Sequence, residues 1–304
     1  MWARSRYGRR GKRYACAVPL RLNWNRAGAG EPLLLLHGIG STHDDFAPLR
    51  PRLDAEFRVL APDLPGHGRS APLAGRPTVQ AITDAVEADL DELDTGRVHV
   101  LGNSIGARVA LELARRHRAL SVVAIAPSGA STTAERVYQG VVQGGARLAL
   151  RAVRPLVPVA ARSVVGRSVL FAGLRARPWR TSRTEAMAIE GGFAGARQFW
   201  STLWWGVLTD LPTGLDGVDC PVILAQGTLD VIAAGQTPRY LAAVPGSRFV
   251  PLPGAGHAPQ SDVPDTIIRL VHQAVALATP DAGRAAVPDA TDPPGRAREE
   301  KRTP

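Results

Sequence analysis

The most constraining feature of this 304-residue chain is the stretch VHVLGNSIGARVALELARRH at residues 98–117, which passes from β-branched residues to helix formers without a loop. So sharp a strand-to-helix turn forces unusual backbone angles, and Gly102 and Gly106 stand where a Cβ would collide. The glycines explain the bend but not Ser104 between them. Serine is a favoured helix N-cap, so Ser104 alone does not separate a capping role from a chemical one.

The rest of the chain alternates short strand patterns with helical ones. PLLLLHGIG at residues 32–40 is continuously apolar, as expected of a strand covered on both faces. Residues 57–61 predict another strand, and residues 78–94 carry apolar side chains at helical spacing. The same alternation returns near the other end of the chain, through residues 221–278. This pattern predicts an α/β fold, with a mostly parallel sheet and helices on both faces.

One internal segment interrupts the alternation. Residues 131–212 have no strand pattern, several helical stretches and much Arg, which predicts a helical insertion into a core made of residues 17–130 and 213–279. A basic arm, residues 1–16, precedes the core. Residues 280–304 are rich in Pro and charge, and we expect a disordered tail there.

Charge and cysteine content exclude several classes of protein. The net charge of +10 is carried almost entirely by Arg, without interleaved aromatic residues or a helical reading head, so we expect no nucleic-acid partner. Cys16 and Cys220 are too few for a disulfide framework and lack the spacing of metal ligands. The basic N-terminus is followed by no signal-type apolar stretch, and no window approaches the roughly 20 apolar residues of a membrane span, so we expect a cytoplasmic protein without stable membrane insertion.

Three chemically useful side chains each follow a predicted strand. Ser104 comes after VHVLG, Asp230 after VILAQGTL, and His257 after RFVPLPGAG. The carboxyl ends of parallel strands meet over one crevice, so these side chains are expected to converge. Serine, acid and histidine in this chain order predict a nucleophile, an orienting acid and a base.

Five motifs in order resemble the serine-nucleophile branch of the α/β-hydrolase family. GNSIG resembles its nucleophile elbow, HGIG its oxyanion loop, DLPGHGRS a common loop, and GTLD and GAGHAP its acid and base loops. The resemblance covers about residues 17–279, with the insertion in the place of the family's cap. It implies a central sheet of about eight strands, a Ser104, Asp230 and His257 triad, and neither metal nor organic cofactor.

Elementary chemistry supports these roles independently. A serine hydroxyl needs a base that removes its proton as it attacks. With an ordinary pKa near ~6.5, His257 can accept that proton and later return it. Asp230 is expected to remain ionised and to hold the imidazole in one tautomer. The resemblance further implies an oxyanion hole formed by the backbone amides of Ile39 and Ile105.

The residues that line the substrate pocket are the hardest to predict from the sequence. The pocket candidates are His37, Gly38, Trp200 and Trp204. A structural role in the loop is favoured for His37, whereas the tryptophans either line an acyl pocket or pack the insertion on the core. Residues 63–70 are expected to stabilise their own turn, and residues 43–45 to form a solvated loop, although they could instead line the pocket entrance.

The predicted function is hydrolysis of a carboxylic ester of a small or medium apolar acyl compound, through an acyl-enzyme on Ser104. A serine at the elbow argues against family members that use aspartate there. One alternative is a carbon-carbon bond hydrolase of ring-fission products, which the GNS elbow resembles, although such enzymes usually have Trp where Ala258 follows His257. Another is a non-catalytic ligand-binding member. Either way we expect a small-molecule ligand and a monomer or homodimer.

Overall fold

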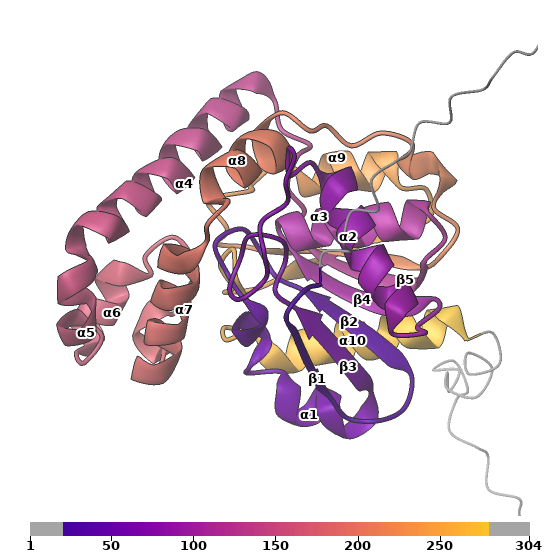
Figure 1. The fold of residues 1–304 in the computed structure, drawn as a ribbon, viewed down its shortest axis with the longest axis horizontal. Coiled ribbons are helices and arrows are strands. Elements are labelled where there is room, and N and C mark those ends of the chain that lie inside the picture. Colours follow the sequence, from indigo (N-terminus) through magenta and orange to yellow (C-terminus); the bar gives the residue numbers. More distant parts are fainter. Residues whose placement is uncertain (1–20, 280–304) are drawn as a thin grey trace, which may run out of the picture.

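The computed structural model describes residues 21–279, so Cys16, the expected basic arm and the expected tail lie outside it. Within these residues seven strands form one sheet in the order β1-β3-β2-β4-β5-β6-β7, where the family resemblance implied about eight strands (Figure 1). The strands are β1 (Trp24–Ala27), β2 (Pro32–Leu36), β3 (Arg58–Pro62), β4 (Val98–Asn103), β5 (Ala119–Ile125), β6 (Val222–Gly227) and β7 (Arg248–Leu252).

The sheet is parallel except at one edge. β1 pairs antiparallel with β3, and every other neighbouring pair is parallel. The carboxyl ends of β2, β4, β6 and β7 therefore lie along the same edge, and the loops that follow them carry the residues predicted to be functional. This confirms the predicted α/β fold class.

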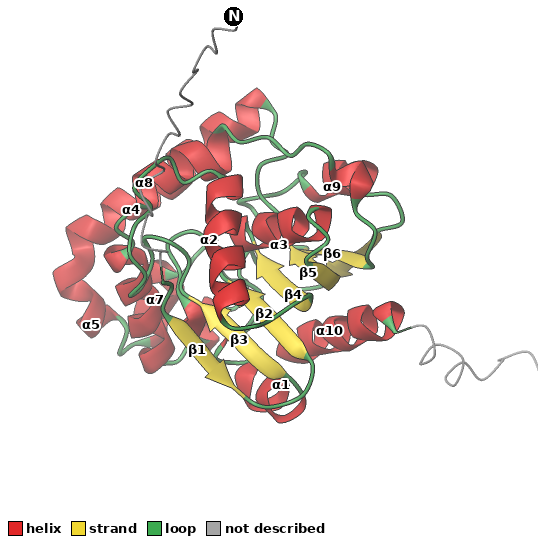
Figure 2. Ribbon diagram, turned by 45° about the vertical axis from the view of Figure 1, so that its right-hand side comes forward, coloured by secondary structure: helices red, strands yellow, loops and turns green. Residues whose placement is uncertain are grey.

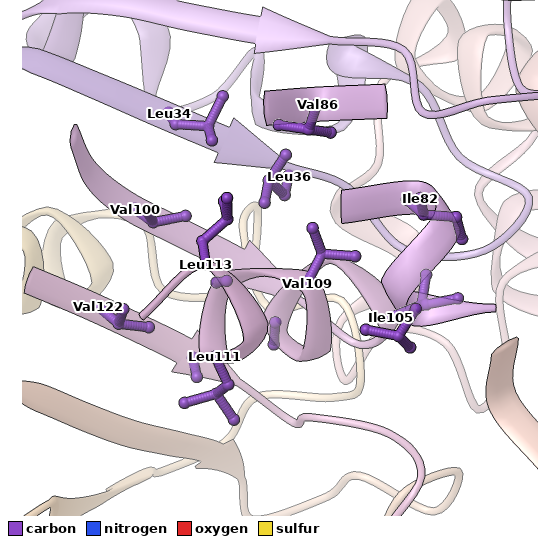
Figure 3. Packing of buried hydrophobic residues seen from close by; sticks show 14 of the residues in the cluster. Leu34, Leu36, Ile82, Val86, Val100, Ile105, Val109, Leu111, Leu113 and Val122 are labelled. Carbon is purple, nitrogen blue, oxygen red and sulfur yellow. The ribbon is translucent and has the colours of Figure 1, made fainter. Parts of the chain in front are cut away.

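Successive side chains of each buried strand point to opposite faces of the sheet. On β2, Leu34 and Leu36 pack into one apolar cluster, and Leu33 and Leu35 into another. Figure 3 shows the first cluster, where Val109 of a helix meets the strand side chains. Burial of one such side chain contributes about 1.5–3 kcal/mol, so both faces must be covered.

Helices cover the two faces in separate layers (Figure 2). The first face is covered by α2 (Val79–Glu92), α3 (Ile105–Arg115) and α9 (Thr237–Ala243), and the second by α1 (Arg50–Glu56) and α10 (Pro264–Ala278). The predicted helix in residues 78–94 is confirmed as α2, whose Thr78 caps it by accepting a hydrogen bond from Ala81 N.

The chain between β5 and β6 contains helices and no named strand of the described sheet. They are α4 (Thr133–Val153), η2 (Arg154–Leu156), α5 (Val157–Ala160), α6 (Val164–Leu170), η3 (Pro178–Arg180), α7 (Arg183–Gly195), α8 (Phe199–Thr202), a π-helical turn η4 (Leu203–Leu208) and η5 (Leu215–Gly217). We call α4 to α8 the cap helices. Figure 1 shows α4 to α7 standing to one side of the sheet.

Capping boxes begin two of the cap helices. Thr132 and Glu135 exchange side-chain and backbone hydrogen bonds at the start of α4, and Ser182 and Glu185 do the same at α7. Among residues 21–279, no helix combines the length and apolar character needed to cross a bilayer.

Candidate active site

Ser104 stands at a strained hinge between β4 and α3. Its φ of 57° and ψ of −116° are unusual for a residue with a side chain, and such strain costs about 1–3 kcal/mol. It occupies the N-cap position of α3, yet its side chain makes no capping hydrogen bond. A Cβ at Gly106 would lie 2.1 Å from Leu36 O, and one at Gly102 would lie 2.4 Å from Gly106 O. The geometry therefore gives Ser104 no capping role and requires both glycines.

The loops after β6 and β7 bring Asp230 and His257 together. Asp230 Oδ2 lies 3.0 Å from His257 Nδ1 and accepts a hydrogen bond of 3.1 Å from Gln226 Nε2. Its other oxygen accepts from the amides of Ile232 at 2.8 Å and Ala233 at 3.0 Å. Both side chains of the pair are buried, so this contact is fixed from several sides.

Electrostatics keep the acid ionised beside the imidazole. Burial alone raises the pKa of Asp230, but His257 and the two backbone amides outweigh it and lower that pKa to about 2. Burial lowers the pKa of His257, whereas the carboxylates of Asp230 and, more weakly, Asp45 raise it, and the net direction is upward. The pair therefore favours an imidazole that accepts a proton readily.

Ser104 and His257 line the same cavity, whose volume is about 220 Å³. Gly38, Ile39 and Asn103 complete its sheet-edge wall. The opposite wall belongs to the chain between β5 and β6, which we call the cap segment. It is mainly apolar, with Gln143 and Glu190 as polar members, and its apolar lining residues are Val142, Ala146, Leu150, Leu170, Phe171, Ile189 and Phe193. The lining, drawn from the described residues, includes Gly38 but not His37, Trp200 or Trp204.

The two residues predicted to form an oxyanion hole lie at the start of α3 and in the loop after β2. Ile105 is the first residue of α3, so its N–H belongs to the unpaired donors at the positive end of that helix. Ile39 lines the cavity from the loop after β2. The next residue, Gly40, has a φ of 73°, and a Cβ there would lie 2.3 Å from Phe193 Cδ2. The loop thus packs closely under the cap.

His37 is a structural residue of the same loop. Its Nδ1 lies 2.8 Å from Gly38 O, and its Nε2 accepts a hydrogen bond of 2.9 Å from Leu64 N. Burial, with a smaller contribution from the neighbouring His67, lowers the pKa of His37 to about 3, so the ring is neutral. This arrangement corrects the assignment of His37 to the pocket, because both ring nitrogens are already occupied by the backbone.

The tryptophans pack outside the cavity. Trp200 stands edge-on to Phe199 at a centroid distance of 5.4 Å and lies against Gly144 of α4. Trp204 lies in the π-helical turn with more than half of its surface exposed. Of the two interpretations left open by the sequence, packing between helices describes Trp200, and neither ring lines the cavity.

Asp45 is the polar residue that the sequence placed wrongly. It was expected in a solvated loop, yet its side chain is 7% exposed and lines the cavity. Its Oδ2 accepts a hydrogen bond of 3.0 Å from Gln260 Nε2, and Arg175 Nη2 lies 4.0 Å from Oδ1. Burial raises the pKa of Asp45, partly opposed by Arg175. Gln260 is 215 residues away, so no local pattern could indicate this contact.

Two further residues hold the His257 loop in place. Asn103 Nδ2 donates a 3.0 Å hydrogen bond to His257 O, so the residue before Ser104 fixes the backbone of the base. Asp262 accepts from the amides of Gly256 at 2.9 Å, Ala176 at 3.0 Å and Arg177 at 3.1 Å. One carboxylate therefore joins the His257 loop to the cap segment.

Asp63 stabilises the loop at residues 63–70 and also joins it to His43, which lies outside that loop. Asp63 accepts hydrogen bonds from Arg69 N at 2.9 Å and from the backbone and ring of His43 at 3.1 and 2.8 Å. Among the described residues, no group of three His, Cys, Asp or Glu side chains is arranged to hold a metal ion. Cys220 is half-buried, and burial raises the pKa of its thiol to about 11.

Comparison with known proteins gives a consistent family match. The sequence model of the alpha/beta hydrolase family matches residues 33–270. The chain is 32% identical over 251 residues to a pimeloyl-[acyl-carrier protein] methyl ester esterase from Aromatoleum aromaticum, covering 80% of this chain and 97% of that protein. It is 38% identical over 136 residues to the dihydrolipoyllysine-residue acetyltransferase component of the acetoin cleaving system from Pseudomonas putida, covering 43% of this chain and only 36% of that protein.

A solved structure shows the same fold. The enol-lactonase from Burkholderia xenovorans LB400 superposes with a TM-score of 0.66 at 21% sequence identity, covering 86% of this chain and 99% of the other.

Proposed function

Because this chain belongs to the alpha/beta hydrolase family, we propose that it hydrolyses a carboxylic ester of a small or medium apolar acyl compound through an acyl-enzyme on Ser104. One observation carries the proposal. The strained Ser104 and His257, which is paired with Asp230, line a single cavity whose far wall is mainly apolar. The full-length similarity to an esterase supports ester cleavage as the reaction class.

Acylation of the serine is the first half-reaction. Ser104 Oγ forms a bond to the ester carbonyl carbon while His257 Nε2 takes the hydroxyl proton. Asp230 holds Nδ1, which leaves Nε2 as the nitrogen free to act, and stabilises the imidazolium. The carbonyl electron pair moves to oxygen, where the amides of Ile39 and Ile105 stabilise the negative charge. Collapse of this intermediate breaks the bond to the alcohol, which leaves with the proton from His257.

Hydrolysis of the acyl-enzyme restores the resting state. Neutral His257 removes a proton from a water molecule as its oxygen attacks the acyl carbon. The same backbone amides stabilise the second oxyanion. Collapse breaks the bond to Ser104 Oγ, which recovers its proton from His257, and the carboxylic acid is released.

The size and lining of the cavity support a small or medium acyl group. Its volume of about 220 Å³ falls below the roughly 300–1,000 Å³ of sites that hold drug-sized ligands. Apolar side chains such as Leu150, Ile189 and Phe193 form the wall that faces Ser104 from the cap. An aliphatic acyl chain buried there gains about 0.8 kcal/mol per methylene.

The decisive test is turnover with a series of p-nitrophenyl esters of increasing acyl length. We expect release of p-nitrophenol by the wild-type protein and its loss in Ser104→Ala. Ser168→Ala is the matched control, because Ser168 lies on α6 with its hydroxyl bonded to Val164 O, outside the cavity lining, and activity should persist. A fluorophosphonate should label Ser104 covalently in the wild type and not in Ser104→Ala.

The same panel separates the competing functions. If a ring-fission product is cleaved faster than every ester, carbon-carbon bond hydrolysis replaces ester hydrolysis. If neither turnover nor labelling occurs, the protein is a ligand-binding member of the fold and the catalytic proposal fails.

A further inference from the structure

Helix α4 carries apolar side chains on two opposite sides. Spacing of four residues places one row toward the cavity: Val142, Ala146 and Leu150. A second row points away from it: Val137, Val141 and Leu148, which are 64, 69 and 59% exposed. A helix that borders water on its outer side normally carries polar residues there. The outer row of α4 therefore indicates a surface that meets something other than water.

The exposed apolar row continues into the following cap helices. Val159 on α5 and Val165 and Val169 on α6 are largely exposed, and Trp179 in η3 is about half exposed. Helix α5 packs against α6, and α6 against η3, so these elements adjoin one another (Figure 1). Single exposed apolar residues are ordinary, but a run of them across adjoining helices marks an interaction site. We call this set, from Val137 to Trp179, the outer cap surface.

The charge of the same segment has one sign. Residues 136–184 contain ten Arg and no Asp, Glu or Lys, which leaves 27 basic and 27 acidic residues in the rest of the chain. The whole net charge of +10 therefore resides between Glu135 and Glu185. Arg147 and Arg175 are buried, whereas Arg151 on α4, Arg162 between α5 and α6, and Arg180 in η3 are exposed.

We propose that the outer cap surface docks on an anionic lipid bilayer. Apolar side chains that insert shallowly and Arg side chains that pair with phosphate groups are the two attractions that hold a protein in the membrane interface. Trp179 lies between Arg177 and Arg180, and tryptophan is enriched at that interface. The net positive charge of the surface selects an anionic bilayer over a neutral one.

A second copy of the chain fits the same surface less well. A two-fold contact places the same patch on both sides of the interface, so exposed arginines would face exposed arginines with no carboxylate of residues 136–184 between them. Docking on lipid also places the cavity next to the bilayer, because α4 forms its wall with the opposite side. The docking proposal does not depend on which side chain attacks the substrate.

Flotation of the full chain with vesicles tests the proposal. We expect the protein to float with equimolar phosphatidylcholine and phosphatidylglycerol, to stay behind with phosphatidylcholine alone, and to dissociate at about 1 M salt, where charges are screened within a few ångströms. Leu148→Glu should weaken binding about tenfold or more, because it removes an exposed apolar group that would insert into the bilayer and adds a charge that anionic lipid repels.

A matched leucine on the core provides the control. Leu277 on α10 is 41% exposed, and Leu277→Glu should bind vesicles like the wild type. Circular dichroism melting checks that each variant is folded, and Val165→Glu on α6 replaces Leu148→Glu if the latter is not.

Three results would overturn the proposal. The first is no flotation with anionic vesicles at low salt. The second is flotation that the folded cap variants leave unchanged, which would transfer the binding to other basic residues, such as the six in residues 1–14. The third is a dimer in light scattering that Leu148→Glu dissociates, without any vesicle binding, which would make this surface an interface between copies.

Discussion

The two walls of the cavity around Ser104 are built by opposite means. At the sheet edge, buried polar side chains are fixed by hydrogen bonds to the backbone, as Asn103 is by its bond to His257 O. The cap wall consists mainly of apolar side chains on helices, and the outer side of α4 is apolar as well. Directed hydrogen bonds hold atoms in one arrangement, whereas apolar contacts tolerate repacking. Under the proposed function, the first wall determines the reaction and the second determines the molecule that undergoes it.

The largest expected effect concerns the base on the sheet-edge wall. His257→Ala should lower kcat by roughly 10⁴-fold or more, because triad residues act as a unit. Steady-state hydrolysis of a p-nitrophenyl ester measures it. His272 on α10 is partly exposed and pairs with Glu56 of α1. His272→Ala is the control, and its kcat should stay near that of the wild type. A loss of only a few-fold in His257→Ala would mean that another residue is the base.

A smaller effect is expected on the cap wall, and it should depend on the substrate. Ala146→Phe fills part of the cavity from α4, so long acyl esters should lose about 10- to 100-fold in kcat/KM relative to acetate. Ala149→Phe makes the same change on the same helix, outside the cavity lining, and should leave chain-length preference unchanged. Equal losses for all esters in Ala146→Phe would show that the two walls do not divide the work as proposed.

The smallest expected effect is a shift in the pH dependence of kcat/KM when Asp45 is substituted. Catalysis requires neutral His257, whose pKa lies above its usual value, so kcat/KM should rise with pH through a midpoint above about 6.5. The carboxylate of Asp45 contributes to that upward direction, so Asp45→Asn should move the rising limb to lower pH.

The pH profile of kcat/KM measures this shift. Asp44→Asn is the control, because Asp44 is exposed on the same loop and its profile should match the wild type. A rising limb that stays in place or moves upward in Asp45→Asn would remove Asp45 from the electrostatics of His257.

The sequence predicted local structure well where one buried face sets the period. Val79, Ile82, Val86 and Leu90 are buried along α2 as their spacing predicted, whereas Leu93, the fifth member of that row, lies just past the helix end and is half-buried. The strand expected at residues 57–61 is β3, displaced by one residue. The contact between His257 and Asp230 could be predicted because each residue follows a strand and parallel strands end at the same edge of the sheet.

Contacts between distant segments could not be predicted in the same way. Asp45 is buried because Arg175 and Gln260 arrive from the cap segment and the His257 loop, and nothing near residue 45 encodes them. Trp200 was a pocket candidate because it lies in the insertion, but it packs against Phe199 and Gly144 and does not line the cavity. Helix α4 of the cap segment carries apolar side chains on two opposite sides, so the period of the sequence alone could not predict which side faces the cavity.

The carboxylate of Asp262 couples the position of the cap segment to the position of His257. Its hydrogen bonds to Gly256 N, Ala176 N and Arg177 N fasten the cap segment and the backbone beside His257 to the same group. A substitution that shifts residues 176 and 177 therefore reaches the placement of His257 as well as the shape of the cavity.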